Sequence, residues 1–274
     1  MSSISPTPEL HDWIEKDKIA IQKAKTIGVG IVTMNNGAHV GAVGHFSMLA
    51  AKQDMVGMCA TSAGTGVLPT FAAEPRFGTN PISIAAPARN EAPLLFDAAT
   101  SQIAGNKFSL AKRVGSDLLP GWIADDTGTP ILEETPVPEG SWYGNLLPLG
   151  GTRELGSHKG YGIALMVDVL CGVLSGNGAG FLHAVPRSCS QYFQAIRIDA
   201  FRPADEFKRD MDLALRTLRE LEPTTGNDQV YYAGMQRAAL KADRIENGIP
   251  LPQHTVGTLK DLANEFEVEF PRVI

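Results

Sequence analysis

Polar residues that could carry chemistry gather in four short segments, three of which contain glycine. In the first, residues 37–44, His39 follows an apolar stretch that predicts a buried strand and precedes a predicted helix. Because an imidazole titrates near neutral pH, a histidine at this position is a candidate general acid or base. An exposed or capping histidine is the alternative interpretation of the same residue.

The glycines of residues 37–44 do not form a Rossmann fingerprint. Their spacing differs from G-x-G-x-x-G, and no acidic residue ends the next predicted strand. The sequence also contains no C-x-x-C, H-E-x-x-H or P-loop motif, and its three cysteines are too scattered for a zinc site. These patterns predict neither a metal site nor a conventional dinucleotide fold.

The second and third segments each combine a polar side chain with a turn or a strand end. Residues 76–81 read Arg-Phe-Gly-Thr-Asn-Pro, a rigid turn that could aim Thr79 and Asn80 at a polar ligand or hydrogen-bond its own backbone. In residues 96–101, Asp97 ends a predicted strand before a run of small residues. That arrangement suits a ribose or anion cradle, and it also suits a plain helix N-cap.

The fourth segment, residues 156–162, precedes an apolar helix. Its small residues let a ligand approach the backbone, and Lys159 places a cation where a phosphate could dock at a helix start. A solvated lysine on a loop is the alternative. From the residues alone, the four segments predict polar loops that converge on an α/β framework.

Hydrophobic periodicity and turn residues predict alternating helices and strands, which is typical of the α/β class. The range 161–174 is apolar nearly all round and predicts a central buried helix, while residues 35–37 predict a loop. Helices are predicted over 9–27, 40–53, 100–114, 161–174, 203–222, 235–247 and 258–265, and strands over 27–33, 56–60, 82–86, 94–97 and 193–198.

The composition of the chain indicates which kinds of partner it binds and in which compartment it is found. The chain has 274 residues, 43% of them apolar, and a formal net charge of -6 without a long basic run, which argues against nucleic acid as the main partner. No secretory signal is visible, and the most apolar window, residues 160–175, is short for a membrane span and contains Asp168. We therefore expect a cytoplasmic protein with no membrane contact.

In this order, the segments resemble the malate/L-lactate dehydrogenase family of NAD(P)-dependent oxidoreductases. The matching stretches include AKTIGVGIVTMNNGAHVGAVGHF (24–46), FGTNPISIAAP (77–87), FDAATS (96–101) and HKGYGIALMVDVLCGVLSG (158–176). The resemblance implies an α/β, mixed-sheet, non-Rossmann fold. It makes residues 1–274 one family region, with a cofactor-binding part over 54–190 and flanking helix and strand parts over 9–53 and 191–274.

The resemblance also implies a reaction, which is reversible hydride transfer between NAD or NADP and a small 2-hydroxy or 2-oxo acid such as malate or lactate. His39 and Asp97 would be catalytic, with His39 exchanging the hydroxyl proton. Thr79 and Asn80 would bind the substrate. The cofactor-binding set would be Ser62, Asp97, Ala98, Ala99, His158, Lys159, Gly160 and Gly234.

Two departures from the family pattern keep alternatives open. The family's late Pro-Gly-x-x-Glu segment reads Tyr-Ala-Gly-Met-Gln at residues 232–236, and an N-terminal Ser-His-Gly motif with a substrate-gripping arginine does not precede the matched region. The alternatives are a cyclic imine acid reductase, or a shortened paralogue that binds cofactor and turns over slowly. The resemblance further implies a homodimer, and the choice between NAD and NADP stays open.

Overall fold

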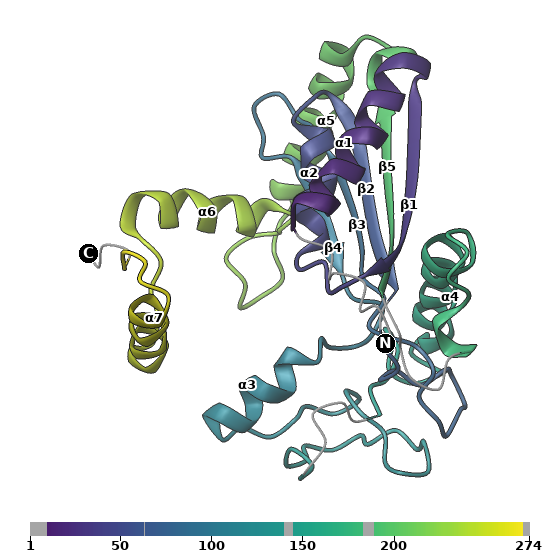
Figure 1. The fold of residues 1–274 in the computed structure, drawn as a ribbon, viewed down its shortest axis with the longest axis vertical. Coiled ribbons are helices and arrows are strands. Elements are labelled where there is room, and N and C mark those ends of the chain that lie inside the picture. Colours follow the sequence, from purple (N-terminus) through teal and green to yellow (C-terminus); the bar gives the residue numbers. More distant parts are fainter. Residues whose placement is uncertain (1–9, 63, 140–144, 183–188, 271–274) are drawn as a thin grey trace.

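A five-stranded sheet with the strand order β1-β5-β2-β3-β4 organises the computed structural model (Figure 1), which describes residues 10–62, 64–139, 145–182 and 189–270. All four strand pairings are antiparallel, and an isolated Val67–Leu146 bridge supplies a parallel pairing outside the sheet. The α/β class is confirmed. The strands are β1 (Val29–Gly37), β2 (Met55–Ser62), β3 (Ile82–Ala86), β4 (Leu94–Ala98) and β5 (Cys189–Arg197).

Two helices cover one face of the sheet and a third lies on the other face. Helices α1 and α2 bury Trp13, Phe46 and Phe193 between themselves and the strands. The helices are α1 (Leu10–Ile27), α2 (Val43–Ala51), α3 (Asn106–Val114), α4 (Ser157–Asp168), α5 (Ala204–Arg219), α6 (Met235–Asn247) and α7 (Gln253–Glu265).

Glycines in the strands let α1 and α2 lie against the sheet at backbone distance. A Cβ atom on Gly30 would lie 1.8 Å from the carbonyl oxygen of Ala20 on α1, and one on Gly57 would lie 2.1 Å from that of Ser47 on α2. Side chains cannot occupy such gaps, so these glycines set the spacing between the helices and the sheet.

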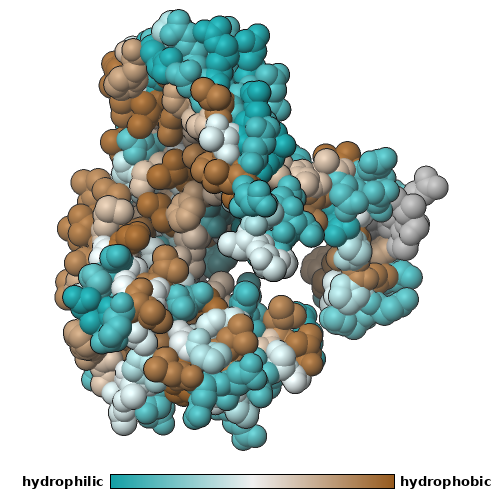
Figure 2. Space-filling model, turned by 180° about the vertical axis from the view of Figure 1, so that it is seen from behind, coloured by the Kyte–Doolittle hydropathy of each residue, from teal (hydrophilic) through white to brown (hydrophobic). Residues whose placement is uncertain are grey.

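The opposite face is covered by α4 and by the π-helix Val169–Val173 that continues it. Val167 and Cys171 pack there against Ala60 and Tyr192. The prediction of a fully buried helix over 161–174 was wrong, because the helix begins at Ser157 and its outer side is open. The apolar side chains on that side are Leu165, Met166, Val169, Val173 and Leu174, which are 37–59% exposed, and Figure 2 shows apolar surface gathered on this side of the molecule.

Several helices and strands begin or end at residues other than the predicted ones. The predicted loop at residues 35–37 lies within β1, because β1 continues to pair with β5 through a bulge that Asn36 enters with a φ of 55°. Helix α3 begins at Asn106 rather than at residue 100, and α7 begins at Gln253 rather than at residue 258. The helix over 235–247 and the strand over 82–86 have the predicted bounds.

Loops and the helix α3 form the part of the molecule below the sheet in Figure 1. A cluster of buried side chains that includes Phe77, Phe108, Leu118 and Leu146 gives these loops and α3 their own core. An isolated antiparallel bridge between Ala124 and Pro130 closes a turn within these loops. At the β4 side of the sheet, α6 and α7 project away from the body, and α6 contains no buried residue.

Candidate functional site

Four of the predicted site segments meet at one edge of the sheet. The antiparallel pairings make β1, β2 and β4 run in one direction and β3 and β5 in the other. The ends of β1, β2 and β4 therefore share an edge with the start of β3. His39 follows β1, Ser62 ends β2, Asn80 lies two residues before β3, and Asp97 lies at the end of β4.

Asp97 contacts the N-terminus of α2. Its Oδ2 accepts a hydrogen bond from the backbone N–H of Gly44 at 3.0 Å, while the N-cap residue of α2, Ala42, makes no side-chain capping bond. Asp97 thus satisfies one of the unpaired N–H groups of α2 and lies at the positive end of its dipole. The carboxylate caps a neighbouring helix rather than its own, and this contact joins the His39 loop to the end of β4.

The His39 side chain is exposed in the loop between β1 and α2. Its Nδ1 accepts a hydrogen bond from the backbone N–H of Gly41 at 3.1 Å. That bond favours the neutral tautomer with its proton on Nε2. Nε2–H is then the group that could donate to a substrate carbonyl oxygen.

Asn80 and Ser62 are both buried, and their contacts run toward the α4 side of the sheet. The Asn80 side chain is 1% exposed, and its Nδ2 donates to the carbonyl oxygen of Ala164 at 3.1 Å, which ties the turn before β3 to α4. Burial raises the pKa of Cys171 to about 12, against the opposing effect of the Ser62 backbone N–H. The thiol is therefore neutral, and the Asn80 amide is used in holding α4.

The first turn of α4 contains His158 and Lys159, which are exposed, and Gly160, which is buried. A Cβ atom on Gly160 would lie 2.3 Å from the carbonyl oxygen of Leu149, so this turn rests directly on the preceding loop. The backbone N–H of Leu149 in turn donates to Thr100 at 2.8 Å. Thr100 lies within the predicted ribose segment, residues 96–101, so the Lys159 turn and that segment form one connected unit.

Gly234, the N-cap of α6, lies against the free edge of β4. Its φ is 100°, and an added Cβ would lie 2.7 Å from the backbone nitrogen of Leu95. That nitrogen donates to the carbonyl oxygen of Ala233 at 3.0 Å. Residues 233–234, which are distant in sequence from β4, therefore lie beside Leu95, two residues before Asp97.

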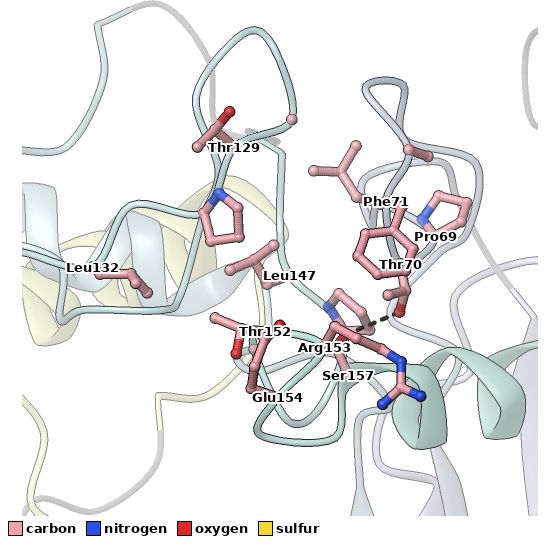
Figure 3. Close-up of a pocket in the computed structure, with 16 residues that line it drawn as sticks. Pro69, Thr70, Phe71, Thr129, Leu132, Leu147, Thr152, Arg153, Glu154 and Ser157 are labelled. Carbon is pink, nitrogen blue, oxygen red and sulfur yellow. Dashed lines mark hydrogen bonds between the residues drawn. The ribbon is translucent and has the colours of Figure 1, made fainter.

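A cavity of about 300 Å³ lies beside the α4 N-terminus among three loops (Figure 3). Phe71, Thr129 and Leu147 line it, and at its α4 side the hydroxyls of Thr70 and Ser157 are 3.0 Å apart. Neither His39 nor Asp97 lines this cavity. It is a separate hollow from the sheet edge that carries the predicted catalytic residues.

Gly44 is the site residue that the sequence interpretation missed. A Cβ atom there would lie 2.6 Å from Oδ2 of Asp97, so only glycine leaves room for the carboxylate at the helix start. The signal was its position in the first turn of a predicted helix.

Within the described ranges, the side chains of His, Cys, Asp and Glu form no group of three or more suited to a metal ion, and no helix is long and apolar enough to cross a bilayer.

Comparison with known proteins gives consistent matches along the chain. A family model described as malate/L-lactate dehydrogenase matches residues 16–260. The malate dehydrogenase of Pyrococcus abyssi is 34% identical over 258 residues, which cover 92% of this chain and 70% of that protein. The ureidoglycolate dehydrogenase of Escherichia coli K12 is 30% identical over 240 residues, which cover 85% of this chain and 65% of that protein.

Solved structures agree with these matches. Malate dehydrogenase from Entamoeba histolytica superposes with a TM-score of 0.85 at 32% identity, over 95% of this chain and 75% of that one. Sulfolactate dehydrogenase from Methanocaldococcus jannaschii gives a TM-score of 0.78 at 30% identity, over 93% and 72%. The chain belongs to the malate/L-lactate dehydrogenase family and is an oxidoreductase of hydroxy acids and oxo acids.

Proposed function

We propose that the chain transfers a hydride reversibly between NAD or NADP and C2 of a small 2-hydroxy or 2-oxo acid, with malate and lactate as the first candidates. The observation that carries the proposal is that the His39 loop, Asp97 and Gly234 all lie along β4, with Gly234 at its start and Asp97 near its end. Relatives named malate and sulfolactate dehydrogenase support the substrate class.

His39 is proposed as the acid–base group. During reduction, the doubly protonated imidazolium gives its Nε2 proton to the alkoxide oxygen that hydride addition forms and keeps its proton on Nδ1, so Nδ1 no longer accepts the Gly41 N–H at this step. Oxidation retraces the same step: the neutral ring with its proton on Nδ1 accepts the hydroxyl proton at Nε2 and becomes the imidazolium. The Gly41 bond to Nδ1 therefore has to break before proton transfer in either direction.

The residues around β4 are suited to hold a dinucleotide. Asp97 uses Oδ2 to cap α2, and we propose that Oδ1 accepts a ribose hydroxyl beside Ala98 and Ala99. Exposed Lys159, in the first turn of α4, supplies a cation for the phosphates, with His158 and Gly160 beside it. The nicotinamide, when bound, supplies or accepts the hydride, and Ser62, Thr79 and Asn80 line the same sheet edge.

The test is a spectrophotometric assay of the purified protein with NADH or NADPH and a panel of 2-oxo acids. Oxidation of the reduced nicotinamide with oxaloacetate, pyruvate or a related acid supports the proposal. Oxidation of the cofactor with cyclic imine acids alone would replace this proposal by the cyclic imine acid reductase alternative. A relative from Pseudomonas putida that is named as a pyrroline-2-carboxylate and piperideine-2-carboxylate reductase favours that alternative, being 33% identical over 159 residues. Tight cofactor binding without turnover on any acid would instead identify a cofactor-binding paralogue.

We also propose a cytoplasmic homodimer. Cys59, Cys171 and Cys189 are all unpaired, which suits a reducing compartment. The open apolar side of α4 is the kind of surface that a second copy would cover. Light scattering of the purified protein measures the mass directly, and a monomer at micromolar concentration would contradict the dimer.

A further inference from the structure

The loop that joins β3 to β4 holds two halves of the proposed cofactor site together. We infer that Asp212, on α5, is a positioning residue that fixes this loop and thereby sets Asp97 and Gly234 relative to each other. The inference rests on the proposed function. Its basis is a set of hydrogen bonds that runs from α5 through this loop to the start of β4 and the segment before α6.

The Asp212 carboxylate is the anchor of that set. It is 3% exposed and accepts backbone N–H groups from Arg89 at 2.9 Å, from Asn90 at 3.0 Å and from Glu91 at 3.1 Å. The Asn90 side-chain amide also donates to Oδ2, at 2.9 Å. Burial raises the pKa of Asp212, but these donors outweigh it and hold the pKa below its ordinary value. The charged form is therefore the one that binds the loop.

A second contact ties the same loop to the same helix. Glu91 pairs with Arg219 at 3.0 Å and with Arg216 at 3.8 Å, both on α5. Because Glu91 also gives its N–H to Asp212, its backbone and side chain are both fixed by α5. The start of the loop is therefore held at several points.

The next residues of the loop hold the start of α6. The Tyr232 hydroxyl donates to the carbonyl oxygen of Ala92 at 3.1 Å. Leu95, at the start of β4, donates its N–H to Ala233 at 3.0 Å, beside the tightly packed Gly234. Residues 89–91 thus bind α5, and residues 92–95 bind the segment that carries Gly234.

The end of β4 depends on this support because β4 is the edge strand of the sheet. One side pairs with β3, and the other is occupied at Leu95 by Ala233. If the loop loosens, β4 and Gly234 lose their common support, and Asp97 shifts relative to the α2 N-terminus that it caps. Asp212 acts on the cofactor through this chain of contacts and does not touch the reacting atoms.

The experiment compares Asp212→Ala and Asp212→Asn with Asp210→Asn. Asp210 is the matched control, since it lies on the same helix, is 63% exposed and pairs with Arg202. The dissociation constant of NADH or NADPH is measured by calorimetry at a temperature where circular dichroism shows each variant folded. The KM of the acid is measured at saturating cofactor.

We expect Asp212→Ala to weaken cofactor binding about tenfold, while the KM of the acid changes little. Asp212→Asn keeps one carbonyl oxygen for the loop N–H groups and should give an intermediate loss, and Asp210→Asn should bind like wild type. A lowered melting temperature with unchanged cofactor affinity in both Asp212 variants would overturn the inference. A wild-type protein that binds neither cofactor would instead overturn the proposed function on which the inference rests.

Discussion

At the scale of single residues, His39 is the side chain most directly linked to the proposed reaction. We expect His39→Ala to lower kcat by about 10²–10⁴-fold, because a general acid or base typically contributes that much, and to leave cofactor affinity nearly unchanged. His45→Ala is the matched control, since His45 is also exposed and lies one helical turn into α2. Full activity of the His39 variant in the nicotinamide assay would remove His39 from the mechanism.

We expect the buried carboxyl of Asp17 to make the free energy of unfolding depend on pH. The side chain is 1% exposed on α1, and within the described part of the chain neither carboxylate oxygen has a hydrogen-bond partner. Burial raises the pKa of Asp17 from 3.8 to about 7. The folded state therefore holds a proton that the unfolded state releases, so this residue costs stability progressively as pH rises from about 4 to about 7.

Asp17→Asn removes that titration. Relative to wild type, the variant should gain about 2–4 kcal/mol of unfolding free energy between pH 4 and pH 8. Urea unfolding of both proteins at several pH values provides the measurement. A difference between the two proteins that stays constant with pH would show that Asp17 is ionised at little cost in the folded state.

At the scale of elements, the N-terminal half of α4 offers a paired test of packing. A Cβ on Gly160 would lie 2.3 Å from the carbonyl oxygen of Leu149, whereas nothing lies within 4 Å of a Cβ on Gly162. We expect Gly160→Ala to destabilise the protein by about 1–3 kcal/mol through overpacking. Gly162→Ala should be neutral or stabilising by up to about 1 kcal/mol, because alanine is the better helix former. Equal urea midpoints for the two variants would contradict this assignment of the α4 contact.

Sequence patterns predicted the ends of those elements that nearby residues, such as capping glycines, determine. Residues 235–247 end at glycines on both sides and follow one amphipathic period, so α6 could be predicted residue for residue. The turn formers at residues 35–37 predicted a loop, yet pairing with β5 keeps them in β1, since a strand distant in sequence supplies the hydrogen bonds. The apolar run over 161–174 reported the hydrophobicity of α4 correctly but gave no information on how much of it the sheet covers.

The same limit applies to the site. The types and order of residues singled out His39, Asp97 and Lys159, because short polar segments beside strands and helices are recognisable locally. The contact of Asp97 with Gly44, and the dependence of the loop before β4 on Asp212, join positions 53 and more than 120 residues apart. No single-sequence pattern encodes such pairs, because each partner alone has an ordinary local role.

At the scale of the whole molecule, protection against hydrogen exchange should follow the arrangement in Figure 1. We expect the amides of β2 and β5, which lie inside the sheet, to exchange slowest. Those of α6, which has no buried residue, should exchange much faster. Mass spectrometry of peptides from a deuterium time course measures this, and equal protection of α6 and β5 would mean that another surface covers the helix in solution.

The order of strands in the sheet has a consequence for how the chain is made. Strand β5 lies between β1 and β2, yet it comes from residues 189–197. On the ribosome, β1 and β2 therefore emerge long before the strand that joins them, and each exposes unpaired backbone groups while synthesis continues. Nascent chains halted before residue 189 should be prone to aggregate and to bind chaperones, and release of the β5 segment should end that vulnerability.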